Sequence, residues 1–163
     1  MDKLQFLLEA KKETYAAHKK PLLLPGEGRR LIYESKEFIY IDIYYGYSPF
    51  GGQELLFKKW QDESFSAIWY MNYGGTILDI SNCHTIEAIF SFLRLALSEV
   101  DENFPFRGPE VFESEKFIYR SKHSGTTEYF SGEEKIILDG ILVYEGHFFG
   151  GEIKGRETFN FGV

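Results

Sequence analysis

The sequence predicts an α+β fold, a two-layer sandwich that arises from an internal duplication of one α-β-β-β unit. The first observation is a repeated heptapeptide: residues 34–40 read ESKEFIY and residues 113–119 read ESEKFIY. The second is a repeated F-x-G-x-E motif, which begins at Phe50 and again at Phe130. The third is the hydrophobic pattern, which twice changes from helical spacing to strand spacing. Because self-similarity at a fixed offset dictates architecture, we expect two copies of one unit related by an approximate two-fold axis.

The first copy begins with a helix and continues with three strands. Apolar residues recur near helical spacing over 3–19, Asp2 can cap this helix, and the proline that follows prevents its continuation. Over 38–45 isoleucines alternate with mostly aromatic residues, which is typical of a strand. Residues 53–60 and 65–73 lie in the same stretch of alternating pattern, and we interpret them as two further strands.

The second copy repeats this order. Apolar residues form one stripe at helical spacing over 85–100, which predicts a helix. Strand patterns follow over 116–123, 127–138 and 141–149. The Asp-Gly pair between the last two strands is a strong signal for a two-residue hairpin.

These elements predict a single domain over 1–163, with halves of about 1–80 and 81–163. The economical arrangement is a continuous antiparallel sheet of about six strands with both helices on one face. We expect the isoleucine rows to face the helices. The rows that carry rings would face away from the helices; they comprise Phe38, Tyr40 and Tyr44 in the first copy and Phe117, Tyr119 and His123 in the second.

The composition excludes several classes of function. The formal net charge is −7, so we expect no nucleic-acid partner, since such binding needs a basic face. The single cysteine, Cys83, provides no disulfide framework and fits a reducing compartment. The four histidines lack the spacing of a zinc motif, and we expect no metal and no cofactor. Without a signal peptide or a long apolar run, the sequence predicts a cytoplasmic protein with no membrane partner.

Aromatic residues are unusually frequent, with 16 Phe, 11 Tyr and 2 Trp. This number exceeds what one small core needs, so we expect some rings on a second, partly exposed surface. The candidate walls of a ligand site are the rings of Tyr40, Tyr44, Trp69, Tyr119 and His123. The alternative for these rings is a place in the core.

Three charged side chains are the candidate polar anchors of that site. Glu54 and Glu134 occupy equivalent positions in the two F-x-G-x-E motifs, where a glycine often marks a bulge that redirects the neighbouring side chain. If the two carboxylates meet near the axis, crowding would raise one pKa and create an acid/base pair. Arg107 lies in the loop FPFRGP and suits fork-like contact with a carboxylate or phosphate. The alternatives are two exposed carboxylates and an arginine that pairs internally.

Several motifs together resemble a known family. They are MDKLQFLLEAKKETYA, FIYIDIYYG, F-x-G-x-E, WYMNYGG, PFRGP, Y-F-S-G-E-E and V-Y-E-x-x-F-x-G-G. The combination is similar to a bacterial family catalogued as a domain of unknown function, which occurs alone and also fused behind Xre-type helix-turn-helix domains. The resemblance implies no known reaction and no catalytic residues. The fusion implies that the domain senses something and passes its state to a DNA-binding neighbour.

Three functional hypotheses follow from these observations. The first is a binding module that holds a small organic molecule on the ring-bearing face of the sheet. The second is an enzyme of the acid/base type that uses the paired glutamates, or His123 and His147, on that face. The third is an interaction protein in which that face forms a homodimer or partner interface, since large exposed apolar patches mark such surfaces.

Overall fold

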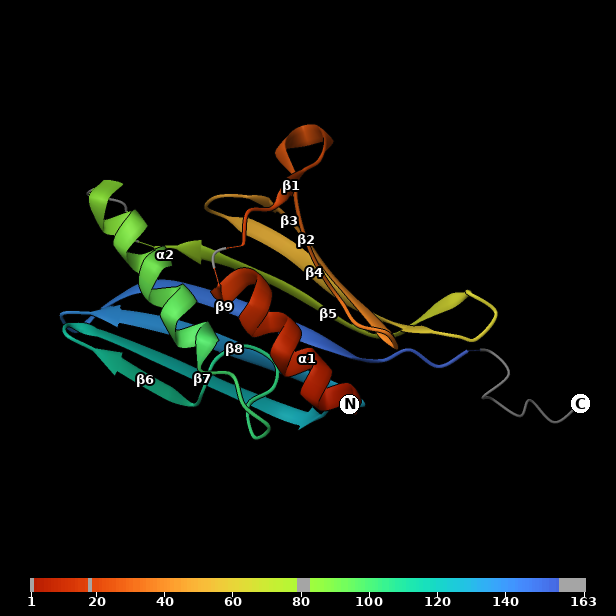
Figure 1. Cartoon of the computed structure of the whole chain (residues 1–163). Coiled ribbons are helices and arrows are strands. Elements are labelled where there is room, and N and C mark those ends of the chain that lie inside the picture. Colours follow the sequence, from red (N-terminus) through yellow and green to blue (C-terminus); the bar gives the residue numbers. More distant parts are fainter. Residues whose placement is uncertain (1, 18, 79–82, 156–163) are drawn as a thin grey trace, which may run out of the picture.

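The computed structural model describes residues 2–17, 19–78 and 83–155 and shows an α+β architecture (Figure 1). Its helical elements are α1 (Lys3–Lys11), a π-helical turn (Lys12–Ala16), a 3-10 turn (Pro25–Glu27) and α2 (Cys83–Ser98). Its strands are β1 (Leu22–Leu23), β2 (Arg29–Glu34), β3 (Phe38–Gly46), β4 (Phe50–Lys59), β5 (Phe65–Ile77), β6 (Val111–Ser114), β7 (Phe117–Thr126), β8 (Tyr129–Leu138) and β9 (Ile141–Glu152).

The nine strands of the described chain form one sheet in the order β1-β2-β3-β4-β5-β9-β8-β7-β6. Every neighbouring pair is antiparallel. β5 and β9 are neighbours at the centre, and the remaining strands follow outward in matching order on both sides. The β4–β5 pairing shifts register after Leu56, and the β8–β9 pairing shifts after Ile136. The two halves of the sheet therefore share one strand order, and each has a register shift two residues after the glutamate of its F-x-G-x-E motif.

The sheet is larger than the six strands predicted from the sequence. Those six correspond to β3, β4, β5, β7, β8 and β9, whereas β1, β2 and β6 add to the two edges. β2 pairs with β3 over six residues, and β6 pairs with β7 over four. Both segments lie in short connectors without a long alternating pattern. They are strands because a neighbouring strand offers them hydrogen-bonding partners, which sequence periodicity does not report.

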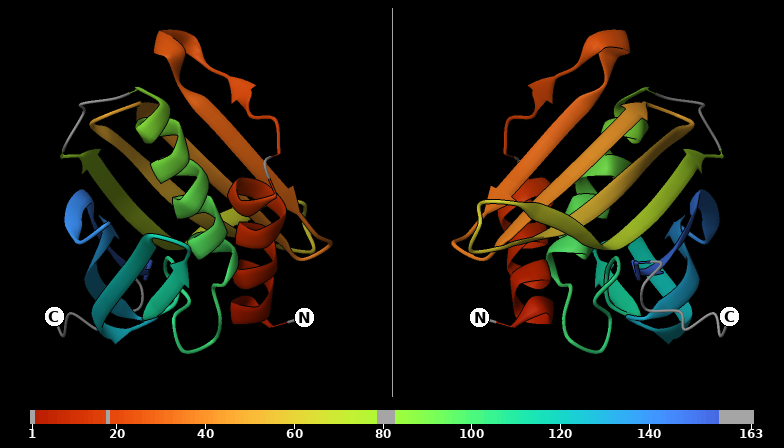
Figure 2. Two further views of the ribbon diagram at one scale, coloured as in Figure 1. Left: turned by 90° about the vertical axis from the view of Figure 1, so that its left-hand side faces the viewer. Right: turned by 90° about the vertical axis from the view of Figure 1, so that its right-hand side faces the viewer.

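Both helices lie against the same face of the sheet, and the sheet curves around them (Figure 2). Tyr40 and Tyr119 are buried on this inner face, with 1% and 0% exposure, whereas Ile39 and Ile41 on the outer face are only partly buried. The predicted alternation is therefore correct, but the prediction that the ring rows face away from the helices was wrong. A ring removes more apolar area from water than an isoleucine, so the ring row is the better partner for the helices.

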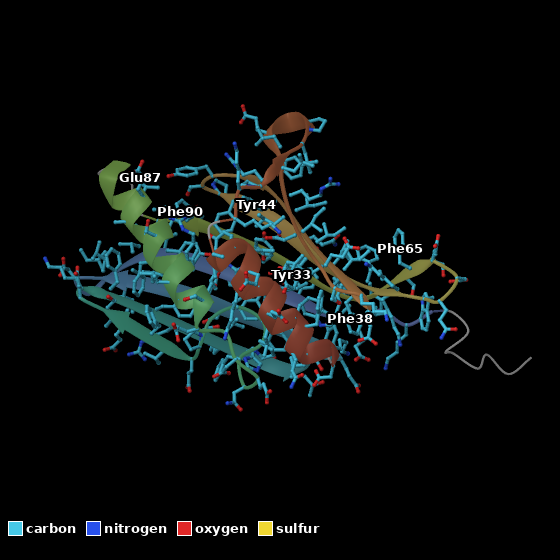
Figure 3. The ribbon with its side chains drawn as sticks, in the orientation of Figure 1. Tyr33, Phe38, Tyr44, Phe65, Glu87 and Phe90 are labelled. Carbon is cyan, nitrogen blue, oxygen red and sulfur yellow. The ribbon has the colours of Figure 1, made fainter. Side chains whose placement is uncertain are left out.

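Each helix is fixed to the sheet by its own apolar cluster. Phe6 of α1 contacts the rings of Tyr33 and Phe38, with centroids 5.6 and 5.3 Å apart, and Figure 3 shows both rings beside this helix. Leu93 of α2 belongs to a second cluster, which includes Tyr144 of β9. The two clusters hold α1 and α2 next to one another over the middle of the sheet (Figures 1 and 2).

The glycines of the repeated F-x-G-x-E motif lie under aromatic rings. A Cβ atom on Gly52 would approach the ring of Tyr73 to 2.5 Å, and a Cβ atom on Gly132 would approach the ring of Phe148 to 2.3 Å. Neither glycine lies at a bulge, because the register shifts occur further along, after Leu56 and Ile136. The motif therefore requires glycine for ring packing, and the predicted bulge at the glycine was wrong.

Replacing Gly52 with alanine is expected to destabilise the protein by about 1–3 kcal/mol, as overpacking typically does. The new methyl group would lie 2.5 Å from the Tyr73 ring and 2.8 Å from the carbonyl oxygen of Ile43. Gly51 is the matched control, since its nearest neighbour would lie at 3.6 Å, an ordinary contact. Urea denaturation of both variants measures the difference. Equal stability of the two variants would contradict the role of Gly52 in ring packing.

Candidate functional site

A cavity of about 440 Å³ lies between the helices and the inner face of the sheet. Its walls come from α1, the π-helical turn, strands β2 to β5, α2 and the loop before β6. Figure 3 labels three lining residues: Tyr44 on β3, and Glu87 and Phe90 on α2. Aromatic rings form much of the wall; they belong to Tyr15, Tyr40, Tyr44, Tyr47, Phe50, Tyr73, Phe90 and Phe106. The cavity thus has the aromatic walls that are typical of small-molecule sites.

A buried ion pair between α1 and β4 forms one part of the cavity wall. The Lys11 Nζ donates a hydrogen bond to the Glu54 carboxylate, and it donates another to the carbonyl oxygen of Phe106 at 2.8 Å. Burial lowers the pKa of Lys11, and the adjacent Glu54 carboxylate opposes that shift. Glu54 therefore forms its own ion pair with Lys11, and both residues are part of the cavity wall.

A second buried ion pair holds Arg107 against β8. The Nη2 of Arg107 lies 2.9 Å from the Glu134 Oε1, and the hydroxyls of Tyr119 and Tyr144 each donate to the same carboxylate at 2.8 Å. Burial alone would raise the pKa of Glu134, but the Arg107 charge and these hydrogen bonds hold it below its ordinary value. The guanidinium of Arg107 also lies 4.7 Å from the centroid of the Tyr73 ring. Arg107 thus forms an internal ion pair with Glu134 and also lines the cavity.

The crowded carboxylates of the site are Asp42 and Glu54, which stand opposite one another on β3 and β4. Asp42 is 2% exposed and accepts a hydrogen bond from the Tyr73 hydroxyl at 2.7 Å. Burial, followed by the charge of Glu54, raises the pKa of Asp42 to about 7. The sequence predicted a raised pKa from crowding between Glu54 and Glu134. The structure gives each of these glutamates its own cation and places the raised pKa on Asp42.

The structure distributes the eight predicted site residues over three places. Four of them line the cavity: Tyr40, Tyr44, Glu54 and Arg107. Three lie behind its wall: Tyr119 and Glu134 in the Arg107 network, and Trp69 in the core, stacked on Phe130 with centroids 5.7 Å apart. His123 lies elsewhere on the inner face.

His123 packs edge-on against the rings of Phe104 and Phe106, with centroids 5.2 and 4.9 Å apart, and burial lowers its pKa. The two histidines pair with successive residues of β8. His123 pairs with Gly132, and His147 pairs with Glu133. Because successive side chains of a strand point to opposite faces, the two histidines lie on opposite faces of the sheet. The predicted histidine pair on one face was therefore wrong.

Sequence reasoning missed several residues that line the cavity. Alternation over 38–45 puts Asp42 on the same face as the rings of that strand, and an acid among rings is itself a signal. Arg29 on β2 and Arg94 on α2 also line the cavity. They are far apart in the sequence, so only the packing of α2 over the sheet brings them to one site.

Two further features concern only the residues that the structure describes. No group of three or more His, Cys, Asp or Glu side chains among them could hold a metal ion. Within the same residues, no helix is both long enough and apolar enough to cross a membrane.

Comparison with known proteins gives one result beyond the geometry. No curated protein and no solved structure matches the chain. A family model does match, over residues 42–153, which is more than half of the chain and extends from the second half of β3 to the end of β9. The chain therefore belongs to the family described as Domain of unknown function (DUF5680).

Proposed function

We propose that this protein is a small-molecule-binding module whose ligand occupies the cavity between the helices and the inner face of the sheet. The observation that carries the proposal is the cavity itself, which has about 440 Å³ of space, aromatic walls and a few polar groups. Sites for small organic molecules have this size and this composition. The ring-bearing face holds the ligand, as expected from the sequence, but it does so beneath the helices.

The buried ion pairs support this function because they fix the wall before a ligand arrives. Lys11 and Arg107 are already held by Glu54 and Glu134, so neither needs a ligand to neutralise its charge. Preorganised polar groups lower the cost of ordering the site on binding. Tyr40, Tyr44 and Tyr73 then offer their rings to the ligand, while Trp69, Tyr119 and Glu134 support the wall from behind.

Blocking the cavity should abolish stabilisation by ligands. Ser91 lies on α2 at the cavity and is exposed, so Ser91→Trp would fill part of the space. In a thermal-shift screen of small aromatic compounds, a ligand at about 100 times its Kd should stabilise the wild-type protein by about 2.7 kcal/mol. The Ser91→Trp variant should lose this stabilisation.

Leu95→Trp is the matched control, since Leu95 is an exposed residue of the same helix that does not line the cavity. Both variants should show the same urea denaturation without ligand. If Ser91→Trp bound every screened compound as well as Leu95→Trp does, the cavity would not be the binding site.

A second candidate function is acid/base catalysis in the same cavity, and the observation that favours it is Asp42. A carboxyl group with a pKa of about 7, buried beside the Tyr73 hydroxyl in a cavity, has the properties of a general acid or base. This candidate replaces the catalytic glutamates and histidines expected from the sequence. This candidate requires that Asp42 retains a proton near neutral pH. The pH dependence of stability, compared between Asp42→Asn and the wild type, tests this requirement.

The other expectations from the sequence remain predictions. An internal duplication is supported by the matching strand order and by the equivalent bulges. The sensory role and the bacterial origin depend on the resemblance, and the cytoplasmic location depends on the single cysteine together with the sequence patterns described above. A homodimer would have to use a surface other than the ring rows, because Tyr40 and Tyr119 are buried within the chain.

A further inference from the structure

Two arginines line the cavity and have no carboxylate partner within the described part of the chain. Arg29 extends from β2 and Arg94 from α2. Among the residues that the structure describes, neither forms an ion pair, whereas Lys11 and Arg107 in the same cavity both do. In a chain with a formal net charge of −7, carboxylates are abundant, so two unpaired guanidinium groups at one cavity are informative.

The hydrogen-bonding capacity of these arginines is largely unused. Arg94 donates from Nη2 to the hydroxyl of Ser91 at 3.0 Å, while its buried Nε has no acceptor among the described residues. Arg29 has its guanidinium 5.9 Å from the centroid of the Tyr44 ring and has no side-chain hydrogen bond within the described chain. A buried donor without an acceptor costs free energy, so this position favours a bound acceptor.

The two arginines reach the same cavity from different elements, and Arg29 lies over the ring of Tyr44 in the cavity wall. Burial and the Asp42 carboxylate raise the pKa of Tyr44, and the charges of Arg29 and Arg94 oppose that rise. Glu87 is the other charged residue of α2 and also lines the cavity. It lies two helical turns from Arg94, about 10 Å along the axis, and it pairs with neither arginine.

Flat apolar surfaces lie next to these charges. The ring of Phe50 meets that of Phe90 edge-on at 6.0 Å and stacks on that of Tyr144 at 6.3 Å, and the Tyr47 ring packs against that of Phe90 at 5.0 Å. Phe50, Phe90 and Tyr47 all line the cavity. Aromatic walls beside guanidinium groups favour a planar ligand that carries an anion at its edge.

We propose that the ligand is a planar aromatic anion whose carboxylate or phosphate is held by Arg29 and Arg94, with its ring against Tyr44, Phe50 and Phe90. Guanidinium groups suit both anions because their paired donors match two oxygens at once. This inference rests on the proposed binding function and adds the chemical class of the ligand.

Four probes that share one ring test the charge requirement: 2-naphthoate, 2-naphthyl phosphate, 2-naphthamide and 2-naphthylmethylammonium. Isothermal titration calorimetry with the full chain should rank the two anions above the neutral amide by about tenfold or more, since hydrogen bonds to a charged group are the strong ones. The ammonium probe should bind most weakly. The comparison of carboxylate with phosphate identifies which anion the site prefers.

Arg29→Gln and Arg94→Gln should each lower the affinity for both anions by about tenfold and leave the affinity for the amide unchanged. Arg120→Gln is the matched control, because Arg120 is an exposed arginine of β7 that does not line the cavity. Urea denaturation of all three variants shows whether they remain folded.

Two outcomes separate failure of this inference from failure of the binding function. If the amide or the ammonium bound as tightly as the anions, and Ser91→Trp abolished that binding, the cavity would bind ligands and the anion assignment would be wrong. If no probe bound, or if Ser91→Trp left all binding unchanged, the binding function and the ligand class would both be overturned.

Discussion

Replacing Arg107 with methionine should lower the free energy of unfolding by about 3–5 kcal/mol at neutral pH, because it leaves a buried carboxylate without its cation. Glu134 is 2% exposed and receives a fork of hydrogen bonds from Arg107 through Nε and Nη2. Tyr119 and Tyr144 would still donate to it, but two neutral hydroxyls do not compensate a full charge in the interior. The loss should therefore approach the upper end for a single substitution.

Urea denaturation at neutral pH measures this loss, with two comparisons that identify its cause. The double variant Arg107→Met/Glu134→Gln should recover part of the stability, since it removes the unpaired charge and retains an acceptor for both tyrosines. Lys116→Met is the control for an exposed pair, because Lys116 and Asp139 lie 3.5 Å apart with largely exposed side chains. That control should change stability by less than about 0.5 kcal/mol.

Acidification should reduce the difference in the free energy of unfolding between the wild type and the Arg107→Met variant. The folded-state pKa of Glu134 lies below its ordinary value, so its contribution in the wild type is present above that ordinary value and is lost as the pH falls. The Arg107→Met variant has no such contribution to lose. Protonation of Glu134 instead removes its unpaired buried charge and so stabilises the folded variant. A difference that stayed constant from neutral to acidic pH would contradict this account of the pair.

The two helices and six of the nine described strands were predictable from the sequence, because each hydrophobic pattern extends over many residues and the repeat doubles the signal. Alternation over Phe38–Gly46 defined β3 and showed which side chains share a face. It could not decide which face lies under the helices, since a period of two is the same seen from either side. That choice depends on side-chain volume and on the polar network, because Glu54 on the ring-bearing face finds its cation, Lys11, on α1.

The cavity was only partly predictable for a related reason. Sequence patterns identified four of its lining residues, because these lie in the repeated motifs or in the stiff loop: Tyr40, Tyr44, Glu54 and Arg107. Asp42 required the register of the hairpin between β3 and β4, which sets it opposite Glu54. Arg29 and Arg94 required the position of α2 over the sheet, and no local pattern contains that information.

The pH dependence of stability should show that Asp42 costs the folded protein free energy when it is ionised. Its pKa rises from an ordinary value of 3.8 to about 7 on folding, so between these values the folded state binds a proton that the unfolded state releases. Stability then falls as the pH rises through this window, because the unfolded state binds fewer protons there. A difference of about three pKa units corresponds to about 4 kcal/mol above neutral pH.

Asp42→Asn should remove this penalty while keeping an oxygen that accepts the hydrogen bond of Tyr73. Relative to the wild type, the variant should be of similar stability near pH 4, and it should gain up to about 4 kcal/mol by pH 8. Urea denaturation at intervals across this range measures the difference, in which other titrating groups cancel. Asp139→Asn is the control, since Asp139 is exposed and asparagine tolerates its left-handed backbone, with φ of 49°. Parallel stability curves for Asp42→Asn and the wild type would show that Asp42 titrates as an ordinary carboxyl group, and would remove the acid/base candidate with it.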